Sequence, residues 1–184
     1  MSGAHRAEQT HRTDVPESTA RLTVDTADGM RELGRSLARL LRRGDLVVLS
    51  GDLGAGKTTL TQGIGAGLAV RDEVTSPTFV IARVHPPTAQ GPALVHVDAY
   101  RLGSLAEVDD LDLDASLADS VTVVEWGEGL VEELADDRLE VRLRRPRGDE
   151  QGGADVAPVE GDEARVVDMT GFGARWRGVD LPAA

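Results

Sequence analysis

The stretch that decides the fold is "SGDLGAGKTTL", Ser50–Leu60, which contains Lys57, the only lysine in a chain with nineteen arginines. Gly51, Gly56, Lys57 and Thr58 match the spacing G-x-x-x-x-G-K followed by Ser or Thr, which is typical of loops that surround phosphate groups. Glycines let successive N–H groups of the backbone point at phosphate oxygens. A lysine amine is compact and sits on a flexible stem, so it suits the interior of such a loop better than a planar guanidinium. The stretch therefore predicts a phosphate-binding loop in which Thr58 supplies a hydroxyl to Mg²⁺.

The sequence on both sides of this loop has the required local structure. "LVVLS", Leu46–Ser50, is a short apolar run typical of a buried strand. Leu60, Ile64 and Leu68 recur at helical spacing after the loop. Gly63, Gly65 and Gly67 would each weaken that helix by about 1 kcal/mol relative to alanine, so we interpret them as positions of close packing.

Further elements follow from periodicity and turn residues. An amphipathic helix is predicted from Met30, Leu33, Leu37, Leu40 and Leu41, with Asp25 or Thr26 as N-cap, Arg42 and Arg43 in the last turn, and Gly44 beyond it. Strands are predicted at 78–84, 93–100, 121–126, 138–144 and 164–169, and helical segments at 105–111 and 130–134. A hairpin loop is expected at 86–92 and a longer flexible connection at 145–163. This alternation indicates a three-layer α/β domain of the P-loop NTPase type with a mixed central sheet.

Length and composition limit the organisation. The 184 residues suit one domain, predicted at 21–172, between a disordered N-terminal tail at 1–20 and a C-terminal tail at 173–184 with no assigned role. The absence of cysteine excludes disulfides, thiolate zinc sites and cysteine nucleophiles. We expect a soluble cytoplasmic protein with no membrane contact, because no apolar run approaches the roughly 18 residues of a membrane span and the first twenty residues lack the apolar core of a secretory signal.

The net charge of −12 also argues against a surface that binds nucleic acid unaided. Nonspecific affinity for nucleic acid comes from clustered Lys and Arg that neutralise phosphates. Any role in nucleic-acid chemistry is therefore expected to run through a partner.

Two acidic residues end apolar strands and are candidates to complete a Mg²⁺ site. Glu125 ends "VTVVE" and Asp98 ends "ALVHVD". One would hold the metal, and the other would orient the attacking water or a metal ligand; spacing alone leaves the assignment open, and either acid could instead be a solvated strand end.

The segment "TSPTF", Thr75–Phe79, lies where nucleotide switches place a loop whose hydroxyl senses the γ-phosphate. Ser76 and Thr78 are the candidates, and the alternative is an ordinary Ser-Pro turn. Trp126 could likewise be a plain core residue.

The guanine-reading motif N-K-x-D cannot occur, because the chain has no asparagine and its lysine already belongs to the loop. ATP is therefore favoured over GTP.

Four motifs in this order and at these intervals resemble the bacterial TsaE family, also called YjeE. They are "GDLGAGKTT" (51–59), "TSPTF" (75–79), "HVDAYRL" (96–102) and "VVEWGE" (123–128). The resemblance covers roughly residues 22–170. Asp162 departs from it, since it stands where some relatives carry a basic residue, for which Arg165 is a candidate substitute.

The resemblance implies a small ATPase that binds ATP and Mg²⁺ and is required for threonylcarbamoyladenosine synthesis on tRNA. Its partners would be the TsaD and TsaB proteins, which transfer the threonylcarbamoyl group, so that tRNA is reached only through them. Nucleotide-binding positions carried over are Thr26, Leu53, Gly54, Ala55, Gly56, Lys57, Thr58, Thr59 and Thr78. The resemblance places Mg²⁺ on Thr58 and Glu125, Asp98 near the γ-phosphate, and Trp126 beside the metal acid; Lys57, Asp98 and Glu125 are the expected catalytic residues.

We predict that ATP binding and hydrolysis reset the partner between turnovers through an order–disorder change at 75–79. Two other classes use the same loop. A small-molecule kinase would need an acceptor pocket and an arginine-rich lid, and no lid-like helical insertion is evident. A nucleotide-gated adaptor would bind ATP without useful hydrolysis.

Overall fold

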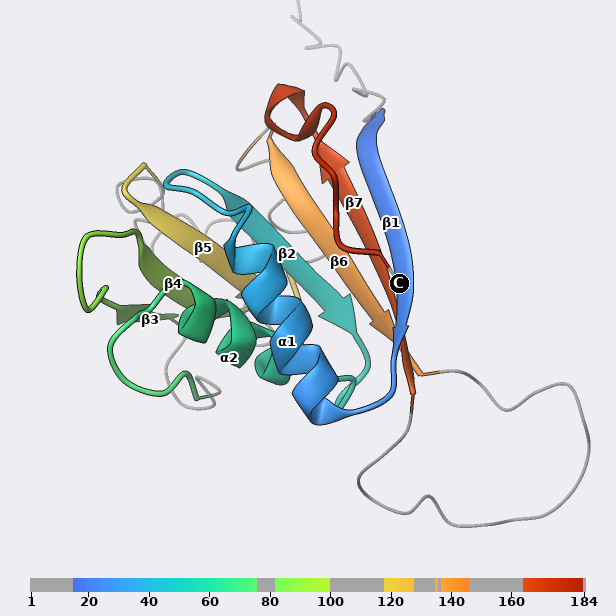
Figure 1. Cartoon of the computed structure of the whole chain (residues 1–184), viewed down its shortest axis with the longest axis horizontal. Helices are drawn as coiled ribbons and strands as arrows, with labels where there is room; N and C mark the ends of the chain where they lie inside the picture. The colour runs from blue at the N-terminus through green and yellow to red at the C-terminus, as the bar shows by residue number, and fades with distance from the viewer. Residues whose placement is uncertain are drawn as a thin grey trace, which may run out of the picture.

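A mixed β-sheet forms the centre of the computed structural model (Figure 1). The structure describes residues 15–75, 82–99, 118–127, 135, 137–145 and 164–183. Within these residues the sheet has seven strands in the order β1-β7-β6-β2-β5-β4-β3. The strands are β1 (Pro16–Val24), β2 (Leu46–Gly51), β3 (Ala82–His85), β4 (Ala93–Asp98), β5 (Ser120–Glu125), β6 (Arg138–Arg144) and β7 (Arg165–Phe172).

The direction of the strands divides the sheet into a parallel centre and antiparallel edges. Strand β2 runs parallel to β5 and β6, and β4 runs parallel to β5. Strands β3, β7 and β1 each pair antiparallel with their neighbours. The α/β fold with a mixed central sheet is confirmed, as are the predicted hairpin between β3 and β4 and the apolar central strands. The helices predicted at 105–111 and 130–134, and residues 78–81 of a predicted strand, lie outside the described residues.

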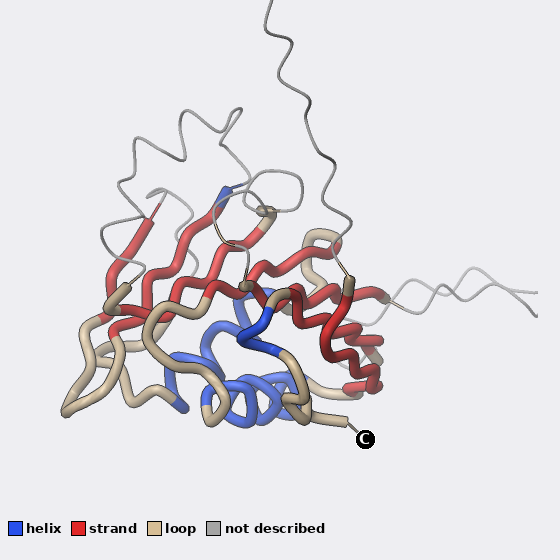
Figure 2. The backbone as a smooth tube through the Cα atoms, turned by 90° about the horizontal axis from the view of Figure 1, so that it is seen from above, coloured by secondary structure: helices blue, strands red, loops and turns tan. Residues whose placement is uncertain are grey.

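Two helices, α1 (Ala27–Ala38) and α2 (Lys57–Gly67), cover one face of the sheet (Figure 2). Side chains of β2 alternate between the faces, so that Val47 and Leu49 pack under the helices while Leu46 and Val48 point to the other face. None of the helices within the described ranges is both long and apolar enough to cross a membrane.

Helix α1 begins at one of its two predicted N-caps but ends earlier than predicted. Of the two candidate caps, Thr26 is the N-cap, and its Oγ1 accepts a hydrogen bond from the Gly29 amide at 3.0 Å. The helix ends at Ala38, so the placement of Arg42 and Arg43 in its last turn was wrong. The apolar pattern continues to Leu41 because that residue remains buried in the turn after the helix.

The glycines of α2 permit close contact with α1, as predicted. A Cβ on Gly63 would lie 2.2 Å from the carbonyl oxygen of Arg31, and a Cβ on Gly34 would lie 2.4 Å from that of Leu60. These distances are far inside van der Waals contact, so the two helix backbones approach each other directly. Close contact fixes the position of α2, whose first residue is Lys57.

Replacing Gly63 with alanine should therefore lower the free energy of unfolding by about 1–3 kcal/mol, the usual cost of overpacking. Without a steric conflict, alanine would instead stabilise a helix by about 1 kcal/mol. Thermal melting of Gly63→Ala checks the sign. Gly91→Ala is the control, because a Cβ there would meet nothing closer than 3.8 Å. A Gly63→Ala protein that melts at or above the wild-type temperature would contradict the packing account.

Both predicted tails contribute to the folded domain. Residues 16–20, which the sequence predicted to be part of the N-terminal tail, form the start of β1. The sequence of β1 is polar, but the strand forms because it pairs with β7. In the C-terminal tail, Trp176 is completely buried in the main core, and Arg175 binds both carboxylate oxygens of Asp45 at 2.9 and 2.8 Å. The described residues 173–183 therefore pack against the domain, although only Trp176 and Leu181 among them are large buried apolar residues.

Candidate functional site

The sequence predicted to bind phosphate forms a tight turn between β2 and α2, at the carboxyl ends of the parallel strands. Gly51, Gly54 and Gly56 all have positive φ angles, of 141°, 74° and 104°. Residues with a side chain rarely adopt positive φ angles, so these glycines allow the backbone to reverse direction. Gly56 is the N-cap of α2, which leaves the N-terminal amides of the helix available to an anion.

Other residues of the turn face in different directions. Ala55 is fully buried, whereas Leu53 is 85 % exposed. Neither apolar side chain can bind a phosphate, and the Ala55 amide donates to the carbonyl oxygen of Asp52 at 3.0 Å within the turn. Thr59 lies in the first turn of α2 and is half-buried.

Lys57 is almost completely buried, at 4 % exposure, and its amine lies inside the turn. Lys57 Nζ donates hydrogen bonds to the carbonyl oxygens of Gly51 and Asp52 at 2.7 and 3.0 Å. The amine also lies 3.7 Å from the centroid of the Trp126 ring, a cation–π contact. Burial lowers the pKa of Lys57, while the nearby carboxylates, chiefly Glu125, oppose this shift.

Trp126 reaches this position because its backbone is in an unusual conformation. Its φ is +62°, in the left-handed region, and its amide donates to the Leu49 carbonyl at 3.0 Å. Left-handed conformations of bulky residues are strained and persist where the surroundings enforce them. Trp126 is half-buried, and its ring covers the lysine amine, so the interpretation as a plain core residue does not describe it.

The Thr58 hydroxyl faces the carboxylate of Glu125, as a joint metal site requires. Thr58 Oγ1 lies 3.1 Å from Glu125 Oε1 and 3.2 Å from Oε2. Glu125 ends β5 next to the phosphate-binding turn, because β5 is paired directly with β2. The carboxylate is 4 % exposed and thus held in place.

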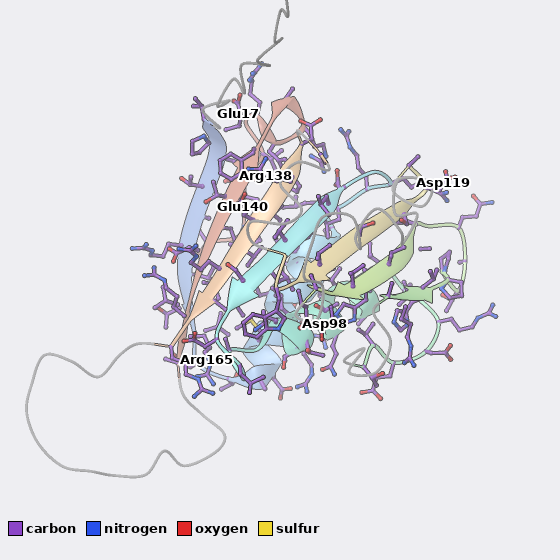
Figure 3. All side chains as sticks on the ribbon, turned by 180° about the vertical axis from the view of Figure 1, so that it is seen from behind. Glu17, Asp98, Asp119, Arg138, Glu140 and Arg165 are labelled. Carbon is purple, nitrogen blue, oxygen red and sulfur yellow. The ribbon has the colours of Figure 1, made fainter. Side chains whose placement is uncertain are left out.

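Asp98 lies opposite Glu125 in the register of β4 and β5. Figure 3 shows Asp98 at the same end of the sheet as Arg165, away from Glu17 and Asp119. Asp98 is only half-buried, so it remains accessible from solvent, unlike Glu125.

The donor set fits Mg²⁺ bound together with a nucleotide. Among the described residues, no three His, Cys, Asp or Glu side chains form a metal cluster. Mg²⁺ commonly takes one or two protein oxygens and completes its shell with water and phosphate oxygens. Thr58 and Glu125 supply such a pair beside the turn, while the glycines and the buried amine match the phosphates.

A pocket of about 960 Å³ continues from the turn onto the face of the sheet opposite α1 and α2. Gly51, Asp52 and Trp126 line one side of it, and Arg142, Arg144 and Arg145 line the other. Arg145 Nη2 donates to the carbonyl oxygen of Gly54 at 3.3 Å. This contact was not predicted; the signal in the sequence would have been that Arg145 follows β6, the second neighbour of β2.

The remaining predicted positions are only partly placed. Thr26 lies one helical turn before Met30, whose side chain would lie 3.6 Å from a Cβ on Gly56. Met30 therefore lies beside the turn, whereas the Thr26 hydroxyl caps α1. Ser76, Thr78 and Asp162 lie outside the described residues. Arg165 opens β7 and is half-buried.

Comparison with known proteins reveals the family. The model of the family described as "Threonylcarbamoyl adenosine biosynthesis protein TsaE" matches residues 24–152. The chain belongs to the TsaE family.

Individual relatives agree with this membership. The protein called "tRNA threonylcarbamoyladenosine biosynthesis protein TsaE" in Streptomyces coelicolor is 64 % identical over 153 residues, which is 83 % of this chain and 97 % of that relative. The protein with the same name in Bacillus subtilis is 36 % identical over 147 residues, covering 79 % of this chain and 82 % of the relative. The crystal structure of YdiB from Bacillus matches with a TM-score of 0.61 and 26 % identity, over 86 % of this chain and 89 % of YdiB.

Proposed function

We propose that this TsaE-family protein is a Mg²⁺-dependent ATPase required for threonylcarbamoyladenosine modification of tRNA. It would act in the cytoplasm on the TsaD–TsaB complex and permit that complex to turn over repeatedly. The observation that carries the proposal is the position of the Thr58 hydroxyl, 3.1 Å from the buried Glu125 carboxylate and next to the only lysine. A Mg²⁺ site beside a phosphate-binding turn is the arrangement by which P-loop proteins hold a nucleoside triphosphate.

In this mechanism, phosphate binding changes the contacts of Lys57. The amine exchanges the carbonyl oxygens of Gly51 and Asp52 for oxygens of the β- and γ-phosphates. Amides at the start of α2 donate to the same phosphates, and the N-terminus of α2 adds its partial positive charge. The absence of asparagine, and hence of the guanine-reading motif, favours ATP.

The two acids take separate roles because their exposure differs. Glu125 is buried against Thr58 and holds the metal together with it. Asp98 is accessible and accepts a hydrogen bond from the water that attacks the γ-phosphorus. Bound Mg²⁺ neutralises charge that develops on the phosphate oxygens. The water oxygen forms the new bond to phosphorus as the bond to ADP breaks.

The net charge of −12 supports an indirect route to tRNA. An acidic ATPase would bind nucleic acid weakly on its own. The TsaD–TsaB complex would hold the tRNA, and this protein would drive its cycle.

Phosphate release should be measured for the protein alone, then with TsaD–TsaB, and then with tRNA added. We expect slow hydrolysis without any small acceptor and at least a tenfold increase with the complex, a change of about 1.4 kcal/mol in the barrier. A kinase would show transfer to an added small molecule instead. The absence of phosphate release under all three conditions would refute the proposal.

A further inference from the structure

His96 lies completely buried beside the candidate metal site, and its position has no role in the mechanism above. His96 Nε2 is 2.8 Å from Glu125 Oε1. Its other ring nitrogen, Nδ1, is buried without a hydrogen-bond partner among the described residues. A polar ring in this place needs an explanation, because burial of an unpaired polar atom costs free energy.

The register of the sheet places the ring under α2. Side chains of β4 alternate, so Leu94, His96 and Asp98 share the face that carries Val123 and Glu125 on β5. An apolar residue would pack in this row at lower cost. The histidine instead contacts Glu125, the carboxylate that also faces Thr58 of α2.

The chemistry of the contact defines which atom donates. An ionised carboxylate only accepts hydrogen bonds, so Nε2 carries the proton and donates to Glu125 Oε1. Glu125 then receives donors from two sides, Thr58 from α2 and His96 from β4. These contacts fix the rotation of the carboxylate.

We propose that His96 is a positioning residue, which holds Glu125 in the orientation that binds Mg²⁺. The inference rests on the proposed function, since it assigns His96 to the same metal site. Groups that orient a metal ligand commonly change metal affinity about 10- to 100-fold when they are removed. A histidine that merely fills the core would have no such effect.

The test compares two substitutions that differ in hydrogen bonding. His96→Gln keeps an N–H donor, whereas His96→Leu keeps volume and removes the donor. His85→Leu is the matched control, because His85 is also buried, on the neighbouring strand β3, where it pairs with Leu94. Among the described residues, no hydrogen bond or ion pair joins it to Glu125. The measurement is the apparent Kd for Mg²⁺, obtained by titrating Mg²⁺ into protein saturated with a fluorescent, non-hydrolysable ATP analogue, with EDTA as the metal-free reference.

We expect His96→Leu to raise the apparent Kd for Mg²⁺ about 10- to 100-fold, with His96→Gln and His85→Leu staying within about threefold of wild type, roughly the scatter of such couplings. If His96→Leu does not fold, His96→Met replaces it as the donor-free variant. A folded donor-free variant with wild-type Mg²⁺ affinity would overturn the inference, as would a His96→Gln protein impaired as strongly as His96→Leu. If the fluorescence of the analogue bound to the wild-type protein does not change with Mg²⁺, the proposed function would be refuted instead.

Discussion

Lys57→Ala is expected to weaken ATP binding at least about thirtyfold and to reduce partner-stimulated turnover below detection. The loss of a buried, hydrogen-bonded cation that contacts an anion costs about 2–5 kcal/mol, and each 1.4 kcal/mol is tenfold in affinity. The amine is held inside the turn by two carbonyl oxygens and an aromatic ring, so no other side chain of the described residues can replace it there. Isothermal titration with ATP and steady-state phosphate release are the two measurements.

Two further variants separate loss of charge from loss of shape. Lys57→Arg keeps the charge, but we expect it to fail because a planar guanidinium does not fit a position with 4 % exposure. Arg39→Ala removes an exposed cation after α1 and should leave binding unchanged. If Lys57→Ala supported repeated rounds of tRNA modification at the wild-type rate, the phosphate-binding role of the turn would be wrong.

Glu125→Gln is expected to abolish multiple turnover while leaving metal-free nucleotide binding intact. The substitution preserves shape but removes the negative charge that holds Mg²⁺ with Thr58. Removal of one preorganised electrostatic group at a reaction centre typically costs about 10²–10³ in kcat. With TsaD–TsaB and tRNA present, modified tRNA should accumulate to about one equivalent and then stop.

This variant also separates an ATPase from a nucleotide-gated adaptor. An adaptor needs only bound ATP, so its Glu125→Gln form would continue through many rounds. Asp119→Asn is the control, since Asp119 is an acid that is 87 % exposed and precedes the same strand. Equal rates for wild type and Glu125→Gln over many turnovers would favour the adaptor.

The parts of the fold that the sequence predicted are those set by local rules. Glycine spacing and one lysine define the turn between β2 and α2, and runs of apolar and β-branched residues define β2 and β5. The buried face of α1 and the close packing at Gly63 follow from the spacing of residues within one helix. The sequence shows this spacing directly. Strand β1 was missed because its sequence "PESTARLTV" is polar and its pairing with β7 joins segments about 150 residues apart.

The parts of the site that could not be predicted depend on contacts between distant elements. The pair of His96 and Glu125 exists only because β4 and β5 are in one specific register. The contact of Trp126 with Lys57 depends on a positive φ angle that no sequence rule gives for tryptophan. The burial of Trp176, likewise, follows from the return of the chain after β7 to the core under α1.

Protection of the single lysine by nucleotide tests the central claim most directly. Acylation of Lys57 can be followed by mass spectrometry of the arginine-cleaved peptide 44–71, which contains no other lysine. Because burial lowers the pKa of Lys57, a larger fraction of its amine is unprotonated and reactive near neutral pH than for an ordinary lysine. We predict that saturating Mg·ATP slows this acylation at least about tenfold, the ratio expected at ten times Kd. An equal rate with and without Mg·ATP would contradict binding of the triphosphate at Lys57, and with it the account of this site.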